Sequence, residues 1–211
     1  MLFVSHNMGA ISRLCSRGVL LEQGKSKKIG NADEVVRHYL AAGRGSEKLD
    51  MVDLTSCEFR YGTQDVRFQW VQLRDSNQQA SRQFSVGDDI TVVFGMKSSG
   101  RYRQMAIAVR IHTSDGILLC HMVNGDSGFQ IEHLRDQEAL SVCIKDVRFY
   151  PDNYYVGLWV GSPTGHETYD LVEDCLSFEI IGGGKSTTRR LAGARLFLTP
   201  EWSVLSTQAL S

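Results

Sequence analysis

From about residue 60 onward, apolar and polar residues alternate in short stretches that are separated by turn residues. This alternation puts every second side chain on one face and is typical of half-buried β-strands. Turns are predicted at residues 84–89 and at Ser114-Asp115-Gly116. Strands are predicted over residues 66–73, 90–96, 105–111, 117–123, 140–144, 154–160 and 176–181. The pattern therefore predicts a mainly β fold, an immunoglobulin-like antiparallel β-sandwich.

The first 42 residues follow a different pattern. An apolar run leads into Ser5-His6, and a helix is predicted over residues 7–15, a hairpin over 18–25 and a second helix over 35–42. Segments of roughly 40 residues rarely bury enough surface to fold alone. A glycine-rich stretch from Gly43 ends the second helix. The predicted organisation is a short α/β segment (1–42), a linker (43–59), the β-sandwich (60–182) and a second linker with a terminal strand (183–211).

Composition removes several classes of protein. The net charge is −1, so the chain lacks the excess of positive charge that favours binding to nucleic acid. No apolar run approaches the roughly 20 residues that span a bilayer. The five cysteines form no C-x-x-C pair, and Cys120, Cys143 and Cys175 lie in apolar or alternating stretches. Buried thiols in a reduced, cytoplasmic chain are therefore expected rather than a disulfide framework.

Sequence motifs for catalysis, cofactors and metals are absent. The six histidines show no H-E-x-x-H spacing, and no G-x-S-x-G motif occurs. The run from Gly182 to Thr187 resembles a phosphate loop, but Glu179 stands where that motif needs its first glycine, so a linker is expected. Glu173 and Asp174 are adjacent in sequence, and alternation would put them on opposite faces, too far apart to flank one glycosidic bond. We therefore expect no enzyme, no cofactor and no metal.

The predicted strand that includes Trp159 carries the clearest signal for a ligand. With Tyr154, Val156, Leu158 and Val160 pointing inward, the outer face carries Tyr155, Gly157, Trp159 and Gly161. A tryptophan between two glycines offers an uncrowded aromatic surface, on which the C–H faces of sugar rings stack. The alternative is that Trp159 packs beneath the C-terminal segment or a dimer partner.

A neighbouring strand supplies polar groups. With Met105, Ile107, Val109 and Ile111 inward, its outer face reads Gln104, Ala106, Ala108, Arg110 and His112. The two alanines leave room, and the two basic side chains are hydrogen-bond donors. The predicted carbohydrate-binding residues are thus Trp159, Tyr155, Arg110, His112 and Gln104. Of the other tryptophans, Trp70 is in register with Phe68 and is expected in the core, whereas Trp202 could anchor a terminal strand.

The chain resembles two parts of one kind of protein. Residues 2–11 resemble the switch-histidine segment of an ABC-transporter ATPase, with the hairpin and the 35–42 helix as the end of that domain. Tyr61-Gly62-Thr63, the Phe84 to Asp88 turn, Ser114-Asp115-Gly116, residues 153–158 and a strand from Gly193 through Leu196 to Trp202 resemble the C-terminal domain of Wzt-type polysaccharide exporters. The resemblance covers nearly the whole chain.

This resemblance implies recognition of an exported bacterial O-antigen polysaccharide in the cytoplasm, at the inner membrane. It also implies a homodimer that exchanges its last strand, and a transporter membrane subunit reached through the parent ATPase. His6 would contact the nucleotide there, but the phosphate loop and signature helix are absent from this sequence, so His6 is expected to be orphaned and ATP not to bind. The alternatives are a ligand-free dimerisation domain and a glycan-modifying enzyme.

Overall fold

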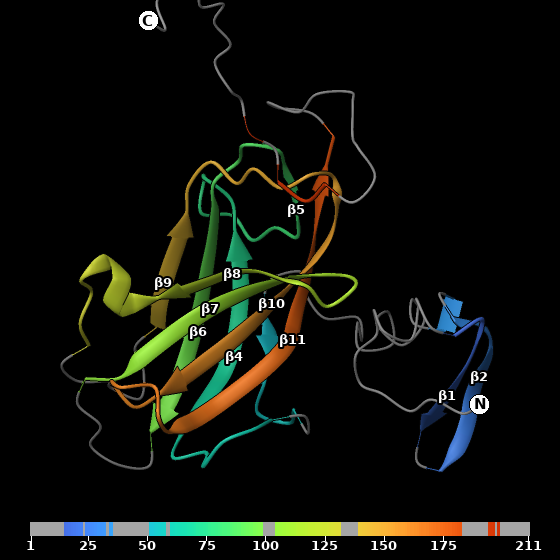
Figure 1. The fold of residues 1–211 in the computed structure, drawn as a ribbon, viewed down its shortest axis with the longest axis horizontal. Coiled ribbons are helices and arrows are strands. Elements are labelled where there is room, and N and C mark those ends of the chain that lie inside the picture. The colour runs from blue at the N-terminus through green and yellow to red at the C-terminus, as the bar shows by residue number, and fades with distance from the viewer. Residues whose placement is uncertain are drawn as a thin grey trace, which may run out of the picture.

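The computed structural model describes residues 15–22, 24–32, 34–35, 51–57, 60–98, 104–131, 139–182, 194–196 and 198. This part of the chain is mainly β, and two sheets stack as a sandwich (Figure 1). One sheet has the order β5-β11-β10-β7-β8 and the other β3-β4-β6-β9, while β1 and β2 form a hairpin of their own. The strands are β1 Arg17–Glu22, β2 Lys25–Asn31, β3 Val52–Asp53, β4 Val66–Arg74, β5 Gln83–Ser85, β6 Ile90–Ser98, β7 Ala106–Thr113, β8 Leu118–Val123, β9 Ala139–Ile144, β10 Asp152–Gly161 and β11 Thr168–Ile181.

The predicted β-sandwich is confirmed, with a strand at each of the predicted positions. β11 begins at Thr168, earlier than alternation indicated, and the short strands β3 and β5 were not predicted. β5 runs parallel to β11, the one parallel pairing among the described strands, so the sandwich is not wholly antiparallel. A single turn of 3-10 helix, Asn124–Ser127, follows β8.

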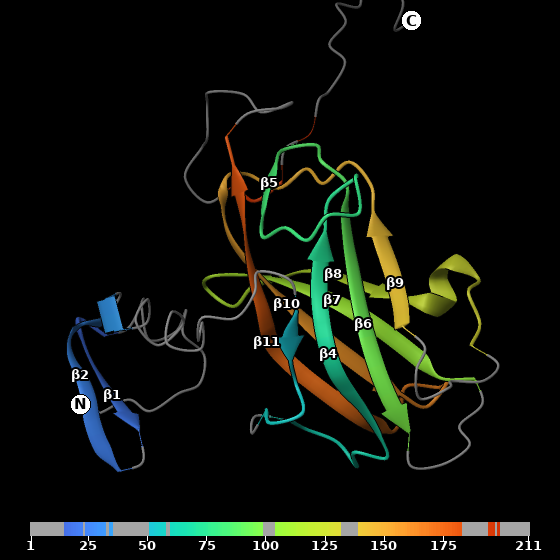
Figure 2. The ribbon, with the colours of Figure 1, turned by 180° about the vertical axis from the view of Figure 1, so that it is seen from behind.

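The core lies between the inner faces of the two sheets. Tyr154, Val156, Leu158 and Val160 of β10 are fully buried, as alternation predicted. From the opposite sheet, Phe68 of β4 meets Phe94 of β6 edge to face, with ring centroids 5.6 Å apart. The two sheets face each other across this core, so each sheet has one inner and one outer face (Figures 1 and 2).

A β-bulge in β4 overturns one expectation. The register with β6 shifts between Phe68 and Trp70. The next inward-facing residue after Phe68 is therefore Val71, where strict alternation predicts Trp70. Trp70 is consequently half-buried on the outer face of the four-stranded sheet and not in the core. Its indole lies over Gly95, where an added Cβ would be 2.3 Å from Nε1. The prediction that Trp70 is a core residue was wrong because a strict two-residue period does not account for the extra residue of a bulge.

The N-terminal hairpin was predicted correctly. β1 and β2 pair antiparallel and turn at Gly24, whose φ of 76° suits glycine. His6 lies outside the described residues, as do the predicted helices at 7–15 and 35–42 apart from Cys15 and Val35.

The C-terminal residues that the structure describes dock on the same chain. The Tyr150 N–H donates to the Arg195 carbonyl at 3.1 Å, and Phe149 forms an isolated antiparallel bridge with Leu196. Arg195 Nη2 lies 3.0 Å from Asp115 Oδ2 in the turn between β7 and β8. Trp202 and the rest of the predicted terminal strand, apart from Leu198, lie outside the described residues, and exchange of that strand stays a prediction.

The described residues also bear on the thiols and on membrane insertion. No disulfide joins the five cysteines, but Cys143 is exposed, so the expectation that all strand thiols are buried was wrong for this residue. Cys143 projects from β9 on the outer face, opposite Thr91.

Within the described part, no helix is long and apolar enough to cross a membrane.

Candidate functional site

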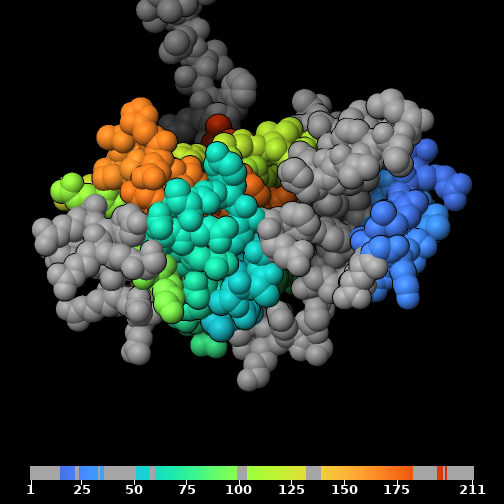
Figure 3. All heavy atoms as spheres, turned by 90° about the horizontal axis from the view of Figure 1, so that it is seen from below, coloured from blue at the N-terminus to red at the C-terminus, as the bar shows by residue number. Residues whose placement is uncertain are grey.

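A row of directly paired residues crosses the outer face of the five-stranded sheet. Tyr61 bridges Leu171 of β11, Leu171 pairs with Trp159 of β10, and Trp159 pairs with Ala108 of β7. Because directly opposite residues in a sheet share a face, these side chains lie in one line. Tyr61 belongs to a segment that covers the edge of β11, where the Thr63 N–H donates to the Thr168 carbonyl at 3.1 Å (Figure 3, teal beside orange). Tyr61 is 71% exposed, so the row begins with an open aromatic ring.

Trp159 is held in a defined position by its neighbours. The indole Nε1 donates to Thr168 Oγ1 at 3.1 Å. An added Cβ at Gly161 would lie 2.5 Å from Cζ2 of the indole, so the ring lies over this glycine. The His121 ring of β8 is 6.4 Å away, tilted by 48°. The side chain is half-buried on the outer face, as predicted, and Gly161 makes room for the ring itself.

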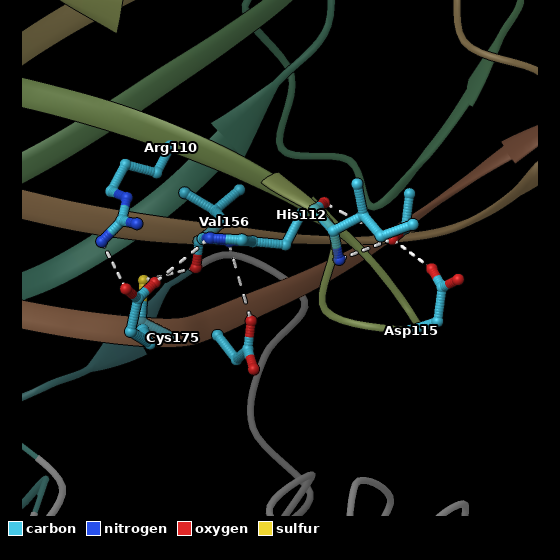
Figure 4. Close-up of polar contacts among 9 residues, drawn as sticks. Arg110, His112, Asp115, Val156 and Cys175 are labelled. Carbon is cyan, nitrogen blue, oxygen red and sulfur yellow. Dashed lines mark hydrogen bonds and ion pairs between the residues drawn. The ribbon is translucent and has the colours of Figure 1, made fainter. Parts of the chain in front are cut away.

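Four titratable side chains meet at Gly157, two residues before Trp159 in β10 (Figure 4). Arg110 Nη1 is hydrogen-bonded to Glu173 Oε1, and His112 Nε2 lies 3.5 Å from Glu173 Oε2. On the other side of the imidazole, His112 Nδ1 lies 4.0 Å from Asp174 Oδ1. Gly157 forms the floor, because a Cβ there would be 2.8 Å from Glu173 Oε2. We call Arg110, His112, Glu173 and Asp174 the charged cluster.

An irregularity in β11 creates this cluster. Val156 pairs with Leu176 and Leu158 pairs with Val172, so three residues of β11 lie opposite Gly157 alone. Asp174 has a φ of 49°, in the left-handed region that aspartate tolerates better than most residues. Glu173 and Asp174 consequently both reach His112 from the outer face. The expectation that these carboxylates point to opposite faces was wrong, because the bulge interrupts alternation between them.

Gln104 is exposed but lies outside the predicted strand, and the other predicted site residues are more buried than the sequence indicated. Gln104 precedes β7 instead of lying within it, and its N–H donates to the Ile131 carbonyl at 3.3 Å. Ala108 is completely buried and leaves no open space above it, and His112 is also buried. Arg110 is engaged by Glu173. Tyr155 is half-buried between Ser177 and His112, the residues opposite it on β11 and β7.

Sequence reasoning missed Tyr61 as a member of the row that contains Trp159, from which it is separated by Leu171, and missed both carboxylates of the charged cluster. One signal was available for the carboxylates. Val172 and Leu176 are inward residues, and strict alternation would bury Asp174 between them, which is costly for an unpaired charge. An aspartate at that position therefore indicates a bulge. The position of Tyr61 has no such signal, because it depends on a loop closing over the edge of β11.

The arrangement is suited to recognition. Trp159 and Tyr61 offer aromatic surface, and ionised carboxylates accept hydrogen bonds from hydroxyl groups. Glycoside cleavage needs two carboxyl groups on opposite sides of a bond, whereas Glu173 and Asp174 are successive residues beside one imidazole. Within the residues that the structure describes, no group of three or more His, Cys, Asp or Glu side chains is arranged to hold a metal ion.

Comparison with known proteins gives one clear relationship. A family model described as the Wzt C-terminal domain matches residues 58–193. A crystal structure of the C-terminal domain of Wzt is similar in fold, with a TM-score of 0.57 and 12% identity, over 71% of this chain and 90% of that chain. At this identity, the structural likeness shows the fold alone. No curated protein matches the chain.

Two further solved structures are much less similar. A domain of the outer membrane lipoprotein Omp28 from Porphyromonas gingivalis has a TM-score of 0.34 and 13% identity, over 57% of this chain and 99% of that chain. The β-glucuronidase of Parabacteroides merdae has a TM-score of 0.33 and 13% identity, over 56% of this chain and 13% of that chain. Similarity at this level has no bearing on function.

Proposed function

The chain belongs to the Wzt C-terminal domain family, and from this premise we propose that the outer face of its five-stranded sheet binds the polysaccharide that an ABC transporter exports. Family membership gives the chain a role in a polysaccharide-export ABC transporter, in a domain that is non-catalytic. The proposed binding residues are Trp159, Tyr155, Arg110, His112 and Gln104.

The position of Trp159 carries this proposal. Its indole N–H is hydrogen-bonded to Thr168, so the polar edge of the ring is satisfied within the protein. The ring lies over Gly161 on the outer face and is only half-buried, so part of its apolar surface faces outward. A ring fixed in this way loses little conformational entropy when a sugar stacks on it, which favours binding.

The polymer we propose is the O-antigen chain of lipopolysaccharide, bound in the cytoplasm before export, at the inner membrane. The proposed partners are a second copy of this chain and, through the parent ATPase, the transporter membrane subunit. The parent ATPase would supply hydrolysis, and this chain would supply recognition without a cofactor or nucleic acid.

A second candidate function is dimerisation without a glycan ligand. Leu196 and Leu198 are 51% and 75% exposed, next to the point where Arg195 docks on the sandwich. Exposed leucines on a terminal segment are suited to a partner copy. On this hypothesis, truncation after Gly184 would convert dimers to monomers, and no polysaccharide would bind.

Trp159→Ala tests the proposed function, with Trp70→Ala as a matched control. Both tryptophans lie over a glycine on an outer face, but on opposite sheets. Binding to the lipopolysaccharide O-chain of the source organism should weaken by about 1–3 kcal/mol in Trp159→Ala, on the scale of removing a stacking aromatic. The control should bind normally. Far-UV circular dichroism and thermal melting on the same samples should show folded protein, and normal binding by folded Trp159→Ala would refute the assignment.

A further inference from the structure

The acidic and basic side chains of the charged cluster differ in their exposure to solvent, which alternation along β7 does not reveal. Arg110 is its one permanent cation, and Glu173 engages it through a direct hydrogen bond. The Arg110 side chain is 20% exposed, whereas Glu173 and Asp174 are 42% and 45% exposed. The two carboxylates are therefore the more exposed groups of the cluster, and the Arg110 side chain is the more buried one.

This arrangement decides which ligand groups the cluster accepts. Ionised carboxylates accept hydrogen bonds and donate none, so they suit hydroxyl groups. A phosphate or carboxylate on the ligand would have to approach Arg110 past Glu173 and Asp174. Like charges at such short range repel strongly where solvent is partly excluded. Arg110 consequently orients Glu173 and is not available to an anion.

The imidazole of His112 supplies an independent observation. Its side chain is nine-tenths buried, with 9% of its surface exposed. Its Nδ1 has no hydrogen-bond partner within the described structure, although Asp174 Oδ1 lies 4.0 Å away. Buried polar atoms without a partner are uncommon in native proteins. Because Nδ1 is itself shielded from solvent, a ligand hydroxyl reaches it only if the partly exposed Asp174 side chain moves outward. The hydroxyl would then bond to both the imidazole and the carboxylate.

The charged cluster and the row of paired residues that contains Tyr61 and Trp159 are close enough to serve one ligand. Gly157, the floor of the cluster, and Trp159 are alternate residues on one face of β10, roughly 7 Å apart at the rise of a β-strand. Resting on the proposed function, we propose that the site selects an uncharged glycan segment. One sugar stacks on Trp159, and a neighbouring hydroxyl group donates to Glu173 or Asp174, while anionic glycans are excluded.

The wild-type chain itself provides the first test. We would measure its binding to a panel of purified bacterial polysaccharides that contains uncharged members and members bearing phosphate or uronic acid. The expected result is binding to one or more uncharged members, with an affinity nearly independent of salt, since no ionic contact forms with the ligand. Preferential, salt-sensitive binding to anionic members would overturn the inference. If that binding still required Trp159, the proposed function would survive.

Two variants make the test specific. Glu173→Gln should weaken the binding of uncharged polysaccharides by about tenfold, because a hydrogen bond to a charged acceptor contributes more binding free energy than one to a neutral amide. Together with Asp174→Asn, it should raise binding to anionic members severalfold, because the two negative charges that repel an anion from Arg110 are removed. Asparagine also tolerates the left-handed backbone at residue 174. Glu22→Gln in the hairpin is the charge-matched control.

The outcomes separate the two hypotheses. If folded Glu173→Gln binds uncharged polysaccharides as well as wild type does, while Trp159→Ala loses binding, the role of the charged cluster is refuted. The proposed function then still stands. If the wild-type chain binds no member of the panel, and none of the O-chain of its source organism, both are refuted. Melting temperatures close to that of wild type confirm that each variant is folded.

Discussion

Asp170 of β11 joins the two sheets by accepting a hydrogen bond from the backbone N–H of Phe68 in β4, 2.8 Å from its Oδ2 atom. Arg60 Nη2 lies 3.2 Å from the same oxygen, and the Arg60 and Asp170 side chains are 2% and 0% exposed. Burial raises the pKa of Asp170, although the Phe68 N–H and Arg60 act in the opposite direction. Arg60 precedes Tyr61 and Asp170 precedes Leu171, so this contact ties the core to the row that contains Tyr61 and Trp159.

Asp170→Ala should therefore destabilise the domain strongly. The change leaves the Arg60 guanidinium buried without its carboxylate, which typically costs about 3–5 kcal/mol. Urea denaturation followed by circular dichroism measures the loss. Asp126→Asn, which changes an exposed carboxylate after β8, should alter stability by less than about 0.5 kcal/mol. A loss below about 1 kcal/mol in Asp170→Ala would show that Arg60 is not held as the structure indicates.

Gly95→Ala should be destabilising because of Trp70. The new Cβ would lie 2.3 Å from the indole Nε1, so the ring must move. We expect a loss of about 1–3 kcal/mol, the usual cost of overpacking. In a Trp70→Ala background the same change should be nearly neutral, and a double-mutant cycle measures this coupling. Gly182→Ala, with no atom within 4 Å of the new Cβ, is the control. Additive effects would contradict the outward placement of Trp70.

Gly157→Ala should disturb the charged cluster with little effect on folding. Its Cβ would lie 2.8 Å from Glu173 Oε2 and 3.5 Å from His112 Cε1. The Glu173 side chain is partly exposed and has room to swing away, so we expect a stability change of about 1 kcal/mol or less. Nitrogen NMR of the His112 ring should show a changed environment at Nε2. Gly125→Ala, where the new Cβ meets no atom within 4 Å, should leave that signal unchanged.

The docking of Arg195 should weaken in acid. Burial alone would raise the pKa of Asp115, but the Thr113 hydroxyl and Arg195 outweigh it, and the pKa falls below its ordinary value of 3.8. A carboxylate with a lowered folded pKa contributes its stabilisation above the unfolded pKa and loses it as pH falls through the folded pKa. The contact should thus be intact at neutral pH and be lost below about pH 4.

Hydrogen exchange at the Tyr150 amide reports this contact directly, since that N–H donates to the Arg195 carbonyl. Arg195→Ala should accelerate the exchange at neutral pH by up to about fivefold, the effect of an ion pair of about 1 kcal/mol. After correction for intrinsic exchange rates, acid should reduce protection in the wild-type chain but not in Arg195→Ala. Equal pH dependence in the two proteins would contradict a role for Asp115.

Much of the architecture follows from local sequence. Alternation located the strands of the sandwich, and the turns at Gly87 and Gly116 lie where glycine accommodates a positive φ, 93° and 76° respectively. The outward position of Trp159 followed from the same period, because β10 pairs with β7 without a register shift. These features depend on residues close in sequence, and for this reason their physical causes are visible there.

Only the tertiary structure decided which side chains meet on the outer face. The bulges in β4 and β11 placed Trp70, Glu173 and Asp174 outward, because the partner strand offers fewer residues than the bulged strand at those points. The pairing of Arg110 with Glu173 joins residues 63 positions apart. The sequence alone determined that a sandwich would present an outward tryptophan, since a two-residue period suffices for that. Strand pairing determined which charged side chains lie beside this tryptophan, because the period within one strand carries no information about the residues of the neighbouring strand.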